Sequence, residues 1–134
     1  MFVVETSRLL PHPPSAVFAV AGDRRLSPRW RTRLADLAEP AHPTDADPPR
    51  HLAWSGRGAA FALDRSLALE STADGTRVTY QCALSVDEPP RLSPARATAL
   101  RRLLVRRAGR DLERLAALVA QMARAEARAR VTLS

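Results

Sequence analysis

Alternating apolar and polar residues dominate positions 64–86, DRSLALESTADGTRVTYQCALSV. Such alternation is typical of strands with one buried face, and the Asp74-Gly75 pair between the two runs favours a tight hairpin turn. With these two residues at the centre of the turn, Leu69 is opposite Tyr80. This register puts apolar side chains on one face and polar or small ones on the other, so it predicts an antiparallel hairpin.

One charged position breaks this pattern. Arg65 falls on the face that leucines otherwise occupy, opposite Leu84 in the expected register. A buried cation is costly unless it meets a carboxylate, a ligand oxygen or water. Arg65 could therefore hold an anionic or carbonyl oxygen of a ligand. Alternatively, it reaches solvent along its aliphatic stem or pairs with an acid such as Glu5 or Asp87.

A third strand is expected before this hairpin. The segment RHLAWS leads through Gly56-Arg57 into GAAFALDRSLALEST, and a glycine at the first central position favours a two-residue type II′ turn. This pairing puts Trp54 opposite Ala59, again on the apolar face.

The chain before these strands predicts a strand and two short helices. Residues 2–10 form the strand, and the PHPP segment stops it. The first helix is PSAVFAVAGD, ended by Gly22, and the second is RLSPRWRTRL, with Ser27 as its N-cap. Residues 39–50 contain four prolines and predict a surface loop.

The C-terminal segment predicts one long helix over residues 93–127. Ser93 is the expected N-cap, and apolar residues recur at steps of three and four. Gly109 in the middle marks either a close approach to the sheet or a gap left for a ligand. Residues 128–134 are expected to fray. Because strands and helices are segregated along the chain, the fold class is α+β with an antiparallel sheet.

Length and composition fit one domain over residues 1–134. No apolar run is long enough to span a membrane, and the N-terminus lacks the features of a signal peptide, so the expected location is the cytoplasm. The single cysteine, Cys82, excludes an internal disulfide and fits a reducing compartment.

Charge is distributed unevenly. Residues 1–90 hold ten Arg and eleven acidic residues, whereas residues 91–134 hold eleven Arg and three acidic residues. This basic segment indicates an anionic partner, such as nucleic acid, a membrane surface or an acidic carrier protein. Alternatively, it is the solvated face of a helix in a chain that contains no Lys and uses Arg throughout.

The order of elements resembles the helix-grip fold of the START-like/Bet v 1-like (SRPBCC) superfamily, in its polyketide cyclase/dehydratase and lipid-transport group. The opening VETSRLLPHPPSAVFAVAGD is similar to that of the family, with the pair Val17-Phe18 and a closing Asp23. Trp30 stands near the usual tryptophan of the second helix, and DGTRVTY resembles the last hairpin. The resemblance covers about residues 2–125.

This resemblance implies a curved antiparallel sheet of about six to seven strands wrapped around a long C-terminal helix, with two short helices after the first strand. A cavity between sheet and helix would hold the ligand, and Arg65 and Tyr80 would be catalytic. The short stretch between Trp30 and His51 implies a reduced strand or hairpin and a smaller cavity. The expected ligand-binding residues are Trp30, Trp54, Phe61, Leu63, Leu67, Leu69, Val78, Cys82, Leu84, Leu100, Leu104 and Ala108.

The implied function is binding of an apolar, polyketide- or lipid-like molecule by a cyclase- or dehydratase-type enzyme of secondary metabolism, without a cofactor. A non-catalytic carrier or sensor is the alternative, and a nucleic-acid or ribosome-binding module that uses the Arg-rich C-terminal helix is a third. The chain could also form a homodimer. The three histidines lack ligand spacing, so no metal is expected, and no nucleotide-binding or serine-hydrolase motif is present.

Overall fold

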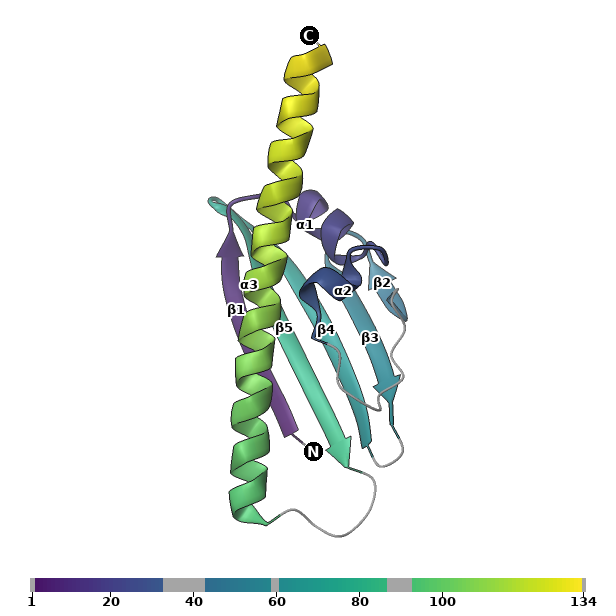
Figure 1. Cartoon of the computed structure of the whole chain (residues 1–134), viewed down its shortest axis with the longest axis vertical. Helices are drawn as coiled ribbons and strands as arrows, with labels where there is room; N and C mark the ends of the chain where they lie inside the picture. The colour runs from purple at the N-terminus through teal and green to yellow at the C-terminus, as the bar shows by residue number, and fades with distance from the viewer. Residues whose placement is uncertain (1, 33–42, 59–60, 87–92, 134) are drawn as a thin grey trace.

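The described residues form a curved, five-stranded antiparallel sheet with three helices on one face (Figure 1). The computed structural model describes residues 2–32, 43–58, 61–86 and 93–133. The strand order is β1-β5-β4-β3-β2. The elements in chain order are β1 (Phe2–Leu10), α1 (Pro14–Ala21), α2 (Ser27–Trp30), β2 (Asp45–Asp47), β3 (His51–Arg57), β4 (Phe61–Thr72), β5 (Gly75–Val86) and α3 (Pro94–Leu133).

The α+β class is confirmed, but the strand count of six to seven is too high for the described residues, which form five. Along β3 and β4, residues alternate between a face buried under the helices and a more exposed face. The exposed face of β4, for example, carries Asp64, Ala68 and Glu70. The opposite face of the same strand buries Leu63 and Leu67, which pack under the helices.

The β4–β5 hairpin forms as predicted, with its register shifted by two residues. Leu67, not Leu69, lies opposite Tyr80. The pairing closes with Thr72 opposite Gly75, so the turn is Ala73-Asp74. Because the shift is even, every side chain keeps its predicted face, and Arg65 lies opposite Cys82 rather than Leu84.

The expected turn at Gly56-Arg57 is wrong. Both residues belong to β3, and Trp54 lies opposite Arg65 rather than Ala59. Gly58 donates its backbone N–H to the carbonyl of Phe61, so the turn comes later in the chain. Ala59 itself lies outside the described residues. The shift of six residues is again even, and Trp54 stays on the buried face.

The segment around α2 also differs from expectation. The helix ends at Trp30, since Arg31 is extended, and Leu26 occupies the N-cap position. Ser27 instead accepts a hydrogen bond from Arg31 Nε at 2.7 Å. The predicted loop contains the short strand β2 at Asp45–Asp47, while its first residues, 39–42, lie outside the described part.

Helix α3 begins as predicted, because Ser93 Oγ accepts the backbone N–H of Arg96 at 3.3 Å. The predicted end at residue 127 is wrong: the helix continues to Leu133, and its last turns project beyond the sheet (Figure 1). A close approach at Gly109 is also wrong, since a Cβ there would meet nothing within 4 Å. The buried stripe of α3 includes Leu112 and Leu115.

Glycine is required at position 75. Its φ is +138°, and a Cβ would collide with the carbonyl oxygen of Leu10, where β1 ends against β5. Gly75→Ala should therefore destabilise the protein by about 1–3 kcal/mol. The free energy of unfolding in urea measures this.

The matched control is Gly109→Ala. This position is helical with open space around it, so alanine should stabilise the protein by about 0.5–1 kcal/mol. If Gly75→Ala did not reduce stability relative to this control, the close contact between Gly75 and Leu10 would be disproved.

Candidate functional site

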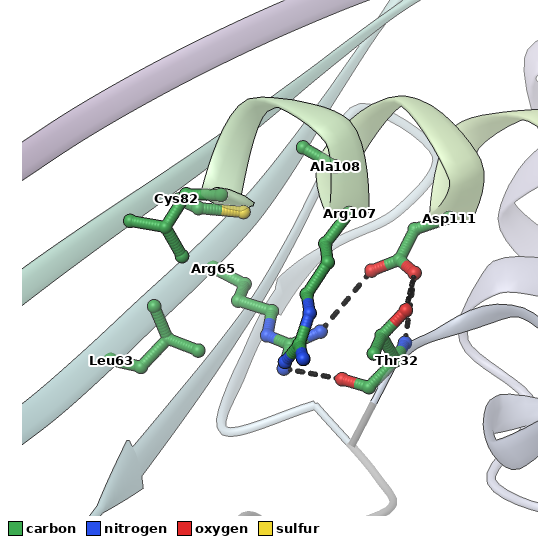
Figure 2. Close-up of a pocket in the computed structure, with 8 residues that line it drawn as sticks. Thr32, Leu63, Arg65, Cys82, Arg107, Ala108 and Asp111 are labelled. Carbon is green, nitrogen blue, oxygen red and sulfur yellow. Dashed lines mark hydrogen bonds and ion pairs between the residues drawn. The ribbon is translucent and has the colours of Figure 1, made fainter. Parts of the chain in front are cut away.

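Arg65 is buried on the face of the sheet that α3 covers, with 4 % of its side chain exposed. Its Nη2 donates to the backbone carbonyl of Thr32 at 2.7 Å. Its Nη1 lies 3.2 Å from Tyr80 Oη and 3.3 Å from Asp111 Oδ2 (Figure 2). The side chain therefore does not reach solvent, and its acid partner is on α3.

Asp111 connects these groups. Its Oδ1 accepts the backbone N–H of Thr32 at 2.8 Å and the hydroxyl of the same residue. Its Oδ2 accepts the hydroxyl of Tyr80 at 3.0 Å and forms the ion pair with Arg65. One carboxylate thus joins α3 to β4, to β5 and to Thr32, which lies just after α2.

Of the two acids suggested as partners of Arg65, Glu5 is wrong, whereas Asp87 stays a prediction. Glu5 is exposed, because it lies on the opposite face of β1 from Val4, and Asp87 lies outside the described residues. The signal for Asp111 was in the sequence. It stands seven residues after Leu104 and seven before Leu118, within the buried stripe of the helix.

Burial controls the protonation of this cluster. It raises the pKa of Asp111 above the ordinary value of 3.8, outweighing the hydrogen bonds from Thr32 and the charge of Arg65. Burial also raises the pKa of Tyr80 well above 10.0, and Cys82 and Asp111 add to the shift. Tyr80 is therefore a neutral phenol that donates its proton to the hydrogen bond with Asp111.

Aromatic side chains fill the space beside the cluster. The ring of Trp30 packs edge-on against Trp54 at 5.6 Å and against Tyr80 at 5.9 Å. The guanidinium of Arg31 lies 4.5 Å from the centre of the Trp54 ring. Both tryptophans are completely buried, so their rings serve here as core.

A small cavity remains between the sheet and the first half of α3. Its volume is about 20 Å³, which is enough for one water molecule. Small-molecule pockets usually measure about 300–1,000 Å³. The cavity is lined by Thr32, Leu63, Arg65, Cys82, Leu104, Arg107, Ala108 and Asp111.

The structure thus brings together five of the expected site residues at this cavity: Leu63, Arg65, Cys82, Leu104 and Ala108. Three lining residues were missed. Asp111 could have been found from its spacing to Leu104 and Leu118, but no sequence pattern distinguished Thr32 or Arg107. The other expected residues do not line the cavity. Phe61 and Leu100 are partly buried at the edge of the core, and Trp30, Trp54, Leu67, Leu69, Val78, Tyr80 and Leu84 are buried within it.

Across the described ranges, no three His, Cys, Asp or Glu residues gather in a way that could hold a metal ion. None of the helices there combines the length and apolar character needed to cross a membrane. Most arginines of α3 are exposed, among them Arg106, Arg110, Arg124 and Arg128. Whether they bind nucleic acid stays a prediction.

The chain matches no protein-family model and no curated protein. Solved structures share its fold. MLL2253 from Mesorhizobium loti is 15% identical with a TM-score of 0.69, over 90% of this chain and 98% of that one. CalU16 from Micromonospora echinospora is 13% identical with a TM-score of 0.59, over 87% and 72%. DynU16, a protein of the dynemicin biosynthetic locus, is 17% identical with a TM-score of 0.60, over 88% and 47%.

Removal of the Asp111 carboxylate should strongly destabilise the protein. Asp111→Ala leaves Arg65 as a buried cation without its ion-pair partner and takes the acceptor from Thr32 and Tyr80, so the loss should be about 3–5 kcal/mol at neutral pH. Urea unfolding of this variant and of Asp64→Ala, an exposed acid on β4, provides the comparison. A similar small effect of both substitutions would contradict the role of Asp111.

The same carboxylate should make stability depend on pH. Its pKa is raised in the folded protein, so between 3.8 and the folded pKa only the folded state keeps the proton. The part of the unfolding free energy that is linked to this proton is fully present below pH 3.8. It is lost as pH rises through this window. We expect the difference in unfolding free energy between the unmodified protein and Asp111→Ala to decrease with pH there. An increase would show that the ion pair with Arg65 outweighs burial.

Proposed function

We propose that this chain is a small helix-grip protein of the START-like type that binds a polyketide- or lipid-like molecule between the sheet and α3. The observation that carries the proposal is the cavity, in which apolar walls from Leu63, Leu104 and Ala108 meet the polar groups of Arg65 and Asp111. Apolar walls with a few convergent polar groups are typical of small-molecule sites. DynU16, a protein of the dynemicin biosynthetic locus, shares the fold and supports a ligand from secondary metabolism.

Most of the ligand must occupy space that opens on binding, because the cavity holds only about one water. The first turns of α3 are the part that can yield. Leu100 is only partly buried there, and Phe2 and Phe61 are partly buried at the adjacent strand ends. These three side chains would cover the apolar body of the ligand, while its polar end faces Arg65.

Binding without catalysis is the role that the hydrogen bonds favour. Nη1 and Nη2 of Arg65, the hydroxyl of Tyr80 and both oxygens of Asp111 already have protein partners. A carrier or sensor needs no reactive group, whereas a catalyst would have to exchange these contacts for contacts with its substrate.

A cyclase- or dehydratase-type reaction is the second candidate, and the protonation states favour it. Asp111 lines the cavity and has a raised pKa, so its carboxyl could exchange a proton with a ligand carbonyl. Tyr80 does not line the cavity and would act through its hydrogen bond to Asp111. Arg65 would then stabilise negative charge on the carbonyl oxygen. A product formed from a linear β-keto acid incubated with the protein would favour this role, and binding without conversion would favour the carrier.

The binding proposal can be tested with N-phenyl-1-naphthylamine, a neutral apolar probe that fluoresces when it leaves water. Leu104→Trp should fill the cavity and weaken binding about tenfold or more, because Leu104 is buried at its wall. Mass spectrometry of small molecules extracted from the purified protein would identify a natural ligand.

Leu103→Trp is the matched control, since Leu103 is an exposed neighbour on the same helix. It should leave probe binding unchanged, and thermal unfolding verifies that both variants are folded. The proposal fails if the unmodified protein does not bind the probe, or if the two variants weaken binding equally.

A further inference from the structure

Arg107 is a second cation at the cavity, and it has no part in the binding and catalytic roles proposed for Arg65, Tyr80 and Asp111. It is half-buried on α3, and its side chain extends from the helix towards the guanidinium of Arg65 (Figure 2). Its neighbour Arg106 is exposed instead, because a step of one residue turns the side chain by about 100° around the helix. The charged group of Arg107 therefore lies at the cavity and is only partly exposed to solvent.

The cavity carries an excess of positive charge. Two of its lining residues are cations, Arg65 and Arg107, and one is an acid, Asp111. Both oxygens of Asp111 are engaged, with Thr32 on one side and with Arg65 and Tyr80 on the other. Within the described part of the chain, no residue forms a hydrogen bond or ion pair with Arg107. One positive charge at the cavity is therefore uncompensated by the residues that line it.

We propose that Arg107, together with Arg65, forms an anion subsite that binds the carboxylate of the ligand. This inference rests on the proposed binding function and specifies its ligand class as an apolar carboxylic acid rather than a neutral lipid. A single carboxylate matches the single excess charge, and the guanidinium of Arg107 can donate to both of its oxygens while Arg65 adds positive charge beside them. The cavity of about 20 Å³ has room for about one water, so the carboxylate would enter as the cavity widens on binding.

The surroundings favour an acid with a long apolar body. The apolar part of the wall consists of Leu63, Cys82, Leu104 and Ala108. These side chains would hold the carboxylate away from bulk water, and ion pairs are stronger in such a low-dielectric environment. An ester, a thioester or an alcohol of the same chain length lacks the charge. The subsite should therefore distinguish the free acid from these neutral derivatives.

The test compares displacement of N-phenyl-1-naphthylamine by decanoate, methyl decanoate and decanol. Decanoate should bind the unmodified protein about tenfold or more tightly than the two neutral compounds. Arg107→Gln should remove most of this preference and leave the affinity for decanol unchanged. Arg106→Gln, which removes an exposed charge one residue away, should retain the preference.

The outcomes separate this inference from the proposal on which it rests. If the probe binds and all three compounds displace it equally well, binding stands and the anion subsite is wrong. If the probe itself does not bind the unmodified protein, the binding function is wrong. A large loss of thermal stability in ligand-free Arg107→Gln would show that Arg107 pairs inside the protein, which would also overturn the subsite.

Discussion

The position of α3 on the sheet depends on one buried carboxylate. Asp111 accepts hydrogen bonds from Thr32 and Tyr80 and pairs with Arg65, so a single residue of the helix contacts three other segments. Leucines around it contribute most of the buried apolar area, but apolar contacts are not directional. A helix held only by leucines could shift along the sheet, whereas a carboxylate with several fixed donors allows one position.

Burial of this charge is costly, as the raised pKa of Asp111 shows. Apolar residues of similar size often stabilise a protein as well as a buried ion pair does. Stability alone therefore does not explain why the cluster is present. Specification of the helix position is one physical reason, and a polar wall for a ligand is another. Arg65 and Asp111 are joined to each other across the sheet and α3 and also line the cavity, so the second reason would apply if the proposed ligand binds there.

The sequence predicted the faces of the sheet better than its pairings. Alternation along β4 and β5 placed Arg65 and Tyr80 on the inner face correctly, because a face survives any even shift in register. The exact register was wrong, since the Asp-Gly preference placed Gly75 inside the turn, whereas Gly75 is paired with Thr72 and lies close to the backbone of Leu10. Contacts across the fold were not predictable either. Nothing near Thr32 in the sequence indicates that its backbone would contact Arg65 and Asp111.

The two halves of α3 have different physical tasks. From Asp111 to Val119 the helix is fixed by the polar cluster and by buried leucines, and it closes the core over the tryptophans. From Leu100 to Arg107 it is more exposed and borders the cavity. A fold can admit a ligand only where separating its layers costs little, and it can orient that ligand only from a rigid part. The boundary between these halves lies at Arg107 and Ala108, at the cavity wall, so a ligand there would meet fixed polar groups at one end and yielding apolar contacts at the other.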